Sequence, residues 1–158
     1  MRFSERHGIV FVSKPADSGG SAVTGDSINM GKYAHVTFLV QHGALTGGAN
    51  VLTVKSGATD GTQTTSETFY YRLADADQGG AGADNYAAWQ SSSSLTLTAA
   101  TYDNKLLIIE MDAAALTDGQ PFLTIEESGV ANPGLISIVA ILSEPRYAAH
   151  DMPTAIPA

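Results

Sequence analysis

Hydrophobic and polar residues alternate in short segments from Gly8 to Ser143, and runs rich in Gly, Ser, Thr, Asp and Asn separate these segments. The pattern is clearest in residues 33–41, where every second residue from Ala34 onward is apolar. Successive side chains of a strand point to opposite faces of a sheet, so these apolar residues share one face. A period of two residues predicts a β-strand here rather than a helix.

Comparable patterns predict strands at short intervals along the rest of the chain. The predicted segments are 9–12, 51–55, 68–73, 95–99, 105–111, 122–126 and 135–143, with a weaker extended segment at 21–30. Residues 105–111 are apolar on both faces, which predicts a central strand that is covered on both sides. About eight or nine short strands with turn signals between them favour an all-β fold, either a β-sandwich or a jelly-roll-like barrel.

The segments between the strands define the domain organisation. Residues 14–20 contain Pro15 and a Gly-Gly pair, which are typical of a loop, and residues 74–85 form the longest irregular region. An alanine run within residues 112–119 favours one helical turn. We therefore expect three parts, namely an N-terminal arm at 1–8, a single β domain at 9–145 and an extended C-terminal arm at 146–158.

The amino-acid composition limits the kinds of molecule that the protein is expected to bind. The chain has 158 residues, of which 44% are hydrophobic, enough for one domain with a core. Only 15% of the residues are charged, which suits a surface that packs against other copies or a larger assembly. The net charge of −8 argues against binding to nucleic acid and against docking on an anionic membrane.

Targeting signals and thiol chemistry are missing from the sequence. The chain has no cysteine, which excludes disulfides and thiolate metal sites. Its first residues contain no apolar segment of the kind found in secretory signals, and its longest apolar run is too short to cross a bilayer. We expect a soluble protein made in a cytoplasm.

Two sets of residues are candidate metal ligands. Asp75, Asp77 and Asp84 loosely resemble a Ca²⁺ loop, but Tyr86 stands where an EF-hand loop needs a bidentate Glu. A solvated Gly-rich loop explains these aspartates better, so no metal or cofactor is expected.

The histidines give no stronger metal signal. His35 and His42 could approach each other across a turn, whereas His7 and His150 lie in the arms. No His-x-x-His spacing occurs, and a zinc site needs three or four ligands. Surface or interface histidines are the favoured interpretation.

The residues of the sequence give little support for catalytic activity. No Gly-x-Ser-x-Gly motif is present, and the adjacent Glu126 and Glu127 must point to opposite sides of a strand. A cupin needs His and carboxylate ligands that converge from several barrel strands, and His35 is the only histidine within a predicted strand. We expect no catalytic residue and no enzymatic activity.

Several segments resemble small virion proteins of tailed bacteriophages, which include head decoration (cement) proteins. The segments are 26–30, 33–40, 68–73, 105–112 and 144–147, and the resemblance covers most of residues 9–147. It implies a β-rich homotrimer that binds the major capsid protein on the capsid exterior and stabilises the shell. Such a protein is made in the host bacterial cytoplasm and ends in the virion.

The arms are the expected contacts with the capsid or with neighbouring subunits. The candidate residues are Arg2, Phe3, Arg6, Arg146, Tyr147, Met152 and Ile156. The alternative is a carbohydrate-binding or receptor-binding sandwich of a phage tail or fibre. In that case Trp89, with Tyr70, Tyr71 and Tyr86, would form an exposed aromatic platform.

Overall fold

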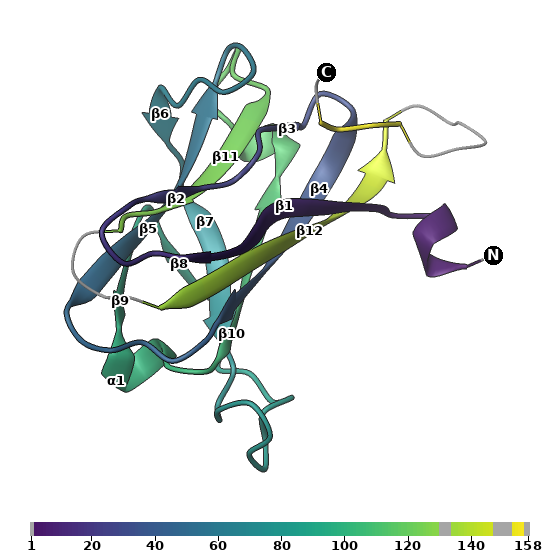
Figure 1. The fold of residues 1–158 in the computed structure, drawn as a ribbon. Helices are drawn as coiled ribbons and strands as arrows, with labels where there is room; N and C mark the ends of the chain where they lie inside the picture. The colour runs from purple at the N-terminus through teal and green to yellow at the C-terminus, as the bar shows by residue number, and fades with distance from the viewer. Residues whose placement is uncertain (1, 130–133, 147–152, 157–158) are drawn as a thin grey trace.

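The computed structural model describes residues 2–129, 134–146 and 153–156, which form two antiparallel β-sheets packed face to face (Figure 1). Sheet A contains, in spatial order, β1 (Gly8–Asp17), β12 (Leu135–Pro145), β4 (Tyr33–His42), β10 (Leu106–Asp112), β7 (Phe69–Leu73) and β8 (Gln90–Ser92). Sheet B contains β2 (Val23–Thr24), β11 (Phe122–Glu127), β5 (Ala49–Gly57) and β6 (Thr65–Ser66), with β3 (Ile28–Asn29) also on β11 and β9 (Leu95–Thr98) on β5.

Helical structure is limited to three short turns in the described residues. They are η1 (Phe3–Glu5), α1 (Ala99–Tyr102) and η2 (Ala113–Ala115). The last of these lies within the segment where an alanine run predicted one helical turn. The prediction of an all-β sandwich is confirmed, and the strands that it missed are two or three residues long, too short to show a period.

The core lies between the sheets and is built by alternation along each strand. Val36, Phe38 and Val40 of β4 are fully buried, and they face Leu123 and Ile125 of β11, which are fully buried as well. Each such side chain contributes about 1.5–3 kcal/mol relative to an exposed one. The period of two residues therefore has a direct cause, because only one face of each sheet meets the other sheet.

The central strand β10 confirms its prediction in part. Its inward residues Leu107 and Ile109 are fully buried, as expected. Its outward residues Leu106 and Ile108 face away from sheet B, yet Leu106 is half-buried and Ile108 is only 8% exposed. The strand is therefore buried on both faces at Ile108, although only one of its faces meets the other sheet.

The first strand is longer than predicted. Residues 14–17 were expected to be a loop, yet β1 continues through Pro15 to Asp17. The strand lies at the edge of sheet A, where a missing N–H is tolerated, and its register shifts between Phe11 and Ser13 and again between Ser13 and Ala16.

The described part of the predicted C-terminal arm packs on its own domain. Ala155 is 3% exposed and belongs to the core, and its carbonyl accepts a hydrogen bond of 2.8 Å from the Asn29 N–H. The Tyr33 hydroxyl donates to the Pro153 carbonyl at 2.5 Å. Residues 153–156 therefore do not extend away from the body, because burying Ala155 and satisfying these backbone groups favours docking.

Candidate functional site

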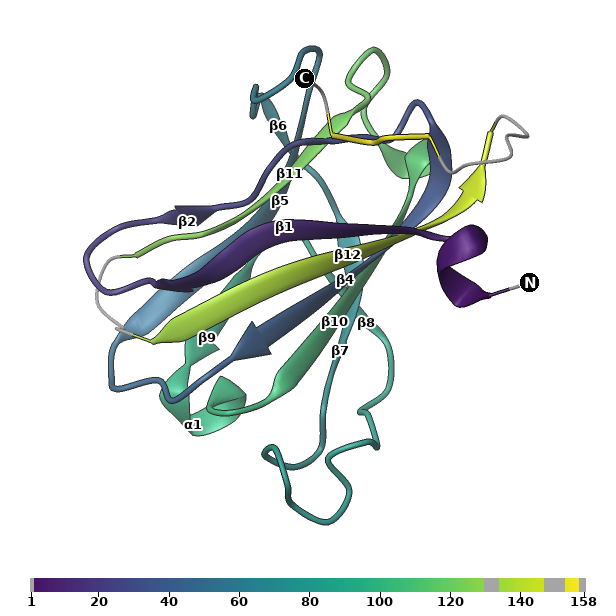
Figure 2. The same cartoon turned by 45° about the vertical axis from the view of Figure 1, so that its right-hand side comes forward.

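The outer face of sheet A carries apolar side chains across neighbouring strands. The β-sheet register places Phe11, Val139, Leu39 and Ile108 opposite one another on β1, β12, β4 and β10. The row above it runs Ile9, Ile141, Thr37, Glu110 and Tyr70. These strands lie side by side in Figure 2, so the two rows form one continuous surface, which we call the outer face.

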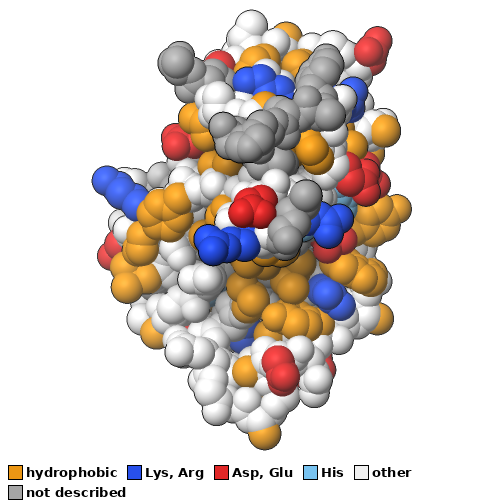
Figure 3. Space-filling model, turned by 90° about the vertical axis from the view of Figure 1, so that its right-hand side faces the viewer, with side chains coloured by type: hydrophobic (Ala, Val, Ile, Leu, Met, Phe, Trp, Pro, Cys, Tyr) orange, Lys and Arg blue, Asp and Glu red, His pale blue; other side chains and the backbone are white. Residues whose placement is uncertain are grey.

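The outer face is accessible at several large side chains. Ile9 is 55% exposed, Phe11 57% and Leu135 59%. Hydrophobic side chains gather in the middle of the surface on the side from which the N-terminal segment projects (Figure 3). A contiguous exposed apolar patch usually marks an interaction surface, so this face is the main candidate site.

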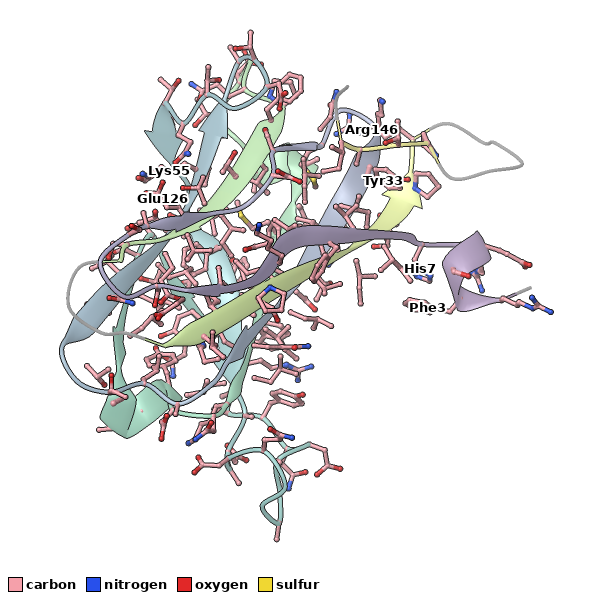
Figure 4. The ribbon with its side chains drawn as sticks, viewed as in Figure 1. Phe3, His7, Tyr33, Lys55, Glu126 and Arg146 are labelled. Atoms are coloured by element: carbon pink, nitrogen blue, oxygen red, sulfur yellow. The ribbon has the colours of Figure 1, made fainter. Side chains whose placement is uncertain are left out.

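The N-terminal arm projects beyond the edge of sheet A next to this face (Figures 2 and 4). None of the three residues of η1 is buried, and Phe3 is 55% exposed. Its ring stacks on His7 with centroids 4.1 Å apart, and the Arg2 N–H donates to the Glu5 carboxylate at 2.7 Å. The candidates Arg2, Phe3 and Arg6 thus share one short, locally ordered, exposed turn.

The C-terminal candidates are not brought together with that turn. Arg146 is exposed after β12, and its N–H donates to the Lys32 carbonyl at 2.9 Å. Ile156 is half-buried against the core of its own domain. Tyr147 and Met152 lie outside the described residues, and contacts of all these residues with a partner stay predictions.

His35 and His42 do not approach each other across a turn, which corrects the sequence-based interpretation. Both lie on β4, and because they are seven residues apart they point to opposite faces. The His35 imidazole donates to Asp112 at 2.7 Å on the outer face. His42 is buried between the sheets, so it is not a surface histidine.

A buried polar network joins the two sheets at His42. The imidazole Nε2 donates to Glu127 Oε2 at 3.0 Å, and the Asn50 amide donates to Glu127 Oε1 at 2.8 Å. Burial by itself would raise the pKa of Glu127, but the hydrogen bonds from His42 and Asn50 outweigh it and lower that pKa. The side chains of His42 and Glu127 are 0% exposed, so the network fits a structural role and offers no access to a substrate.

The prediction for the Glu126–Glu127 pair is confirmed. Glu126 points outward, where it accepts hydrogen bonds from Lys55 Nζ at 3.2 Å and from Thr24, and Figure 4 shows it beside Lys55. Glu127 points inward to His42. Sequence reasoning missed this second pairing, although Glu127 shares its strand face with Leu123 and Ile125.

A second buried carboxylate lies near the β5–β6 edge of sheet B. Glu67 accepts hydrogen bonds from the Ser56 hydroxyl and from the Thr117 N–H, the latter at 2.9 Å. Desolvation alone would raise the pKa of Glu67, and these hydrogen bonds lower it overall.

The aspartates of the long loop do not assemble a cation site. Among the residues that the structure describes, no group of three or more His, Cys, Asp or Glu side chains is placed to hold a metal ion. The loop is closed by an isolated bridge between Ala74 and Tyr86 and is tied to the domain by the Gln78 N–H, which donates to the Asn104 carbonyl at 2.9 Å.

The aromatic residues divide into two environments. Tyr71 packs partly against the core, and its hydroxyl donates to Gln90. Tyr70 and Trp89 face solvent at 61% and 43% exposure, and they line a groove of about 360 Å³ with His35, Glu110, Met111 and Asp112. We call this the β7–β8 groove, and it lies at the far end of the outer face from β1.

These features define an all-β sandwich with an exposed apolar face. Comparison with known proteins adds information about the fold only. Neither a protein-family model nor a curated protein sequence matches the chain. The crystal structure of the SPBc2 prophage-derived protein YomS is similar, with a TM-score of 0.51 and 13% sequence identity over 86% of this chain and 91% of that chain. A desmodium yellow mottle tymovirus chain reaches a TM-score of only 0.21 at 10% identity over 90% of this chain and 91% of that one, and no conclusion is drawn from it.

No helix within the described ranges has the length and hydrophobicity needed to cross a membrane.

Proposed function

We propose that this protein is a structural protein of a tailed phage that decorates the outer surface of the capsid and stabilises the shell. In this proposal its partners are the major capsid protein and further copies of itself, arranged as a homotrimer. The role requires binding surfaces and no catalytic chemistry.

The observation that carries the proposal is the apolar outer face of sheet A. Ile9 and Phe11 expose more than half of their surface at the sheet edge, opposite Ile141 and Val139 of β12, and Leu39 lies opposite Val139 on the next strand. Keeping such a surface in water is unfavourable by about 25 cal/mol for each Å² of apolar area. A protein that stays bound to a large assembly would bury this apolar surface in the contact.

Two further observations support the same role. The fold is shared with a prophage-derived protein, although at 13% identity this likeness concerns architecture. The net charge of −8 repels nucleic acid, which suits a position on the exterior of a particle filled with DNA.

The N-terminal arm fits as an added attachment point. Phe3 is presented on a short turn that projects from the body, with Arg2 and Arg6 beside it. An arm that binds a neighbour while the outer face is also bound raises the effective concentration of both contacts.

The test is attachment to capsids of the phage or prophage whose genome encodes the chain. Purified protein is added to capsids that lack it, and the bound fraction is measured by sedimentation and by electron microscopy. The double variant Ile9→Ser, Phe11→Ser should lose attachment. The control is Val51→Ser, which changes a residue that is 39% exposed on sheet B and should attach normally.

Light scattering on the free and bound protein tests the trimer separately. Failure of the unmodified chain to bind capsids would overturn the proposed role. Equal binding by the double variant and the control would instead show that the outer face is not the contact.

A further inference from the structure

The β7–β8 groove lies at the end of the outer face remote from Ile9 and Phe11, and it combines two exposed aromatic rings with two carboxylates. The capsid contact proposed at Ile9 and Phe11 uses none of these four side chains. Tyr70 lies on β7, Trp89 immediately precedes β8, and Glu110 and Asp112 lie on β10. The register places Glu110 directly opposite Tyr70, so an acidic and an aromatic side chain stand next to each other on the same face. We infer that this groove binds a neutral saccharide.

Trp89 is held in place before any ligand arrives. The guanidinium of Arg72 lies over the indole ring, 4.6 Å from its centroid, and also over the ring of Tyr86 at 4.9 Å. Trp89 still keeps 43% of its surface exposed and borders the groove. A braced aromatic ring loses little conformational freedom when an apolar surface stacks on it.

The polar side of the groove is also ordered. Asp112 accepts a hydrogen bond of 2.7 Å from His35 Nδ1, and Glu110 lies 4.0 Å from Nε2 of the same ring. An ionised carboxylate offers about four acceptor sites, so each acid retains capacity for hydroxyl donors. Asp112 is accessible for this purpose, with 69% of its side chain exposed.

This pairing matches the two chemistries of a sugar ring. The C–H faces of a pyranose are apolar and stack on an indole or phenol ring, while its hydroxyl groups donate to carboxylates. A cationic ligand fits less well, because Arg72 already lies against Trp89 and His35 lies between the acids. The groove volume of about 360 Å³ is within the range of small-ligand sites.

The chain offers a direct reporter, because Trp89 is its only tryptophan. Intrinsic fluorescence of the full-length protein is titrated with maltohexaose, cellohexaose, N-acetylchitohexaose and mannohexaose, each into the millimolar range. At least one of these probes should change the emission of Trp89 in a saturable manner.

Two variants keep the reporter and test the groove. Tyr70→Ala and Asp112→Asn should each weaken binding of the active hexasaccharide about tenfold. Phe3→Ala is the matched control, since it removes an exposed aromatic ring from the N-terminal arm and should leave binding unchanged. Circular dichroism of each variant verifies that the fold is retained.

The inference is overturned by any of three results. The first is that none of the four hexasaccharides changes the fluorescence of Trp89. The second is a change that Tyr70→Ala and Asp112→Asn leave unaltered. The third is a change with oligolysine alone. The last result would assign the groove to cations. None of these outcomes depends on capsid attachment, because the titrations use the free protein.

Discussion

Removal of His42 should destabilise the domain strongly, because it leaves the Glu127 carboxylate buried without its main partner. Both side chains are 0% exposed, and the remaining donors to Glu127 would be Asn50, 2.8 Å from Oε1, and the Ser18 side chain. Breaking a buried pair by removing one partner reduces the free energy of unfolding by about 3–5 kcal/mol. We expect His42→Leu to lose this amount at pH 7, a large part of the roughly 5–15 kcal/mol typical of a domain.

The loss should be smaller in acid. In the native protein the lowered pKa of Glu127 means that its contribution to stability is present above the unfolded-state pKa and disappears as the pH falls through the folded-state pKa. Without His42, desolvation dominates and the folded-state pKa of Glu127 should rise above the unfolded value. Protonation then relieves the buried charge, so the difference between His42→Leu and the native protein should shrink toward pH 4.

Guanidinium unfolding followed by circular dichroism measures this difference in stability. The single variant Glu127→Leu and the double variant His42→Leu, Glu127→Leu complete the double-mutant cycle. The double variant should recover much of the loss, because no unpaired charge remains. The control is His35→Leu on the outer face of the same strand, where Asp112 is 69% exposed and the pair is worth about 1 kcal/mol or less. The reasoning fails if His42→Leu costs no more than His35→Leu, or if the double variant is less stable than either single one.

Three further predictions concern stability elsewhere in the domain. Because Glu127 and Glu67 both have lowered pKa values, the stability that they contribute should be lost as the pH falls below about 4. In an acid titration monitored by circular dichroism, Glu67→Gln should therefore lose less stability than the unmodified protein. Gly57→Ala should cost about 1–3 kcal/mol in chemical denaturation, because a Cβ there would meet a backbone oxygen at 2.2 Å, whereas Gly43→Ala, with its nearest atom at 3.4 Å, should change little. Ala155→Asp should cost about 2 kcal/mol or more in urea, because the site is 3% exposed, and a native-like midpoint would show that the C-terminal segment contributes nothing.

The candidate surfaces were only partly predictable. The alternation in residues 33–41 correctly separates the inward Phe38 from the outward His35, but by the same two-residue period Tyr33 belongs on the outward face with His35. Tyr33 is 1% exposed, because the C-terminal segment covers it and accepts its hydrogen bond. That contact joins residues 120 positions apart, and no local pattern reports it.

The same limit applies to the groove. Sequence reasoning grouped Trp89 with three tyrosines by proximity along the chain, whereas the register of β7 on β10 selected Tyr70 and supplied Glu110. His35 and Asp112 are likewise partners only because β10 pairs with β4 in that register.

The sequence by itself determined that this chain forms the strands of an all-β domain and that Glu126 and Glu127 point to opposite faces, because both follow from a two-residue period. Whether the strands form a sandwich or a jelly-roll-like barrel was decided by the tertiary structure. Tertiary structure alone decided which apolar face of β10 meets sheet B, which carboxylate meets His42, and which end of the chain docks on the core. Side-chain alternation is a local property of an extended backbone, whereas strand order, register and layer packing depend on contacts between distant segments. The exposed outer face and the β7–β8 groove are products of those distant contacts.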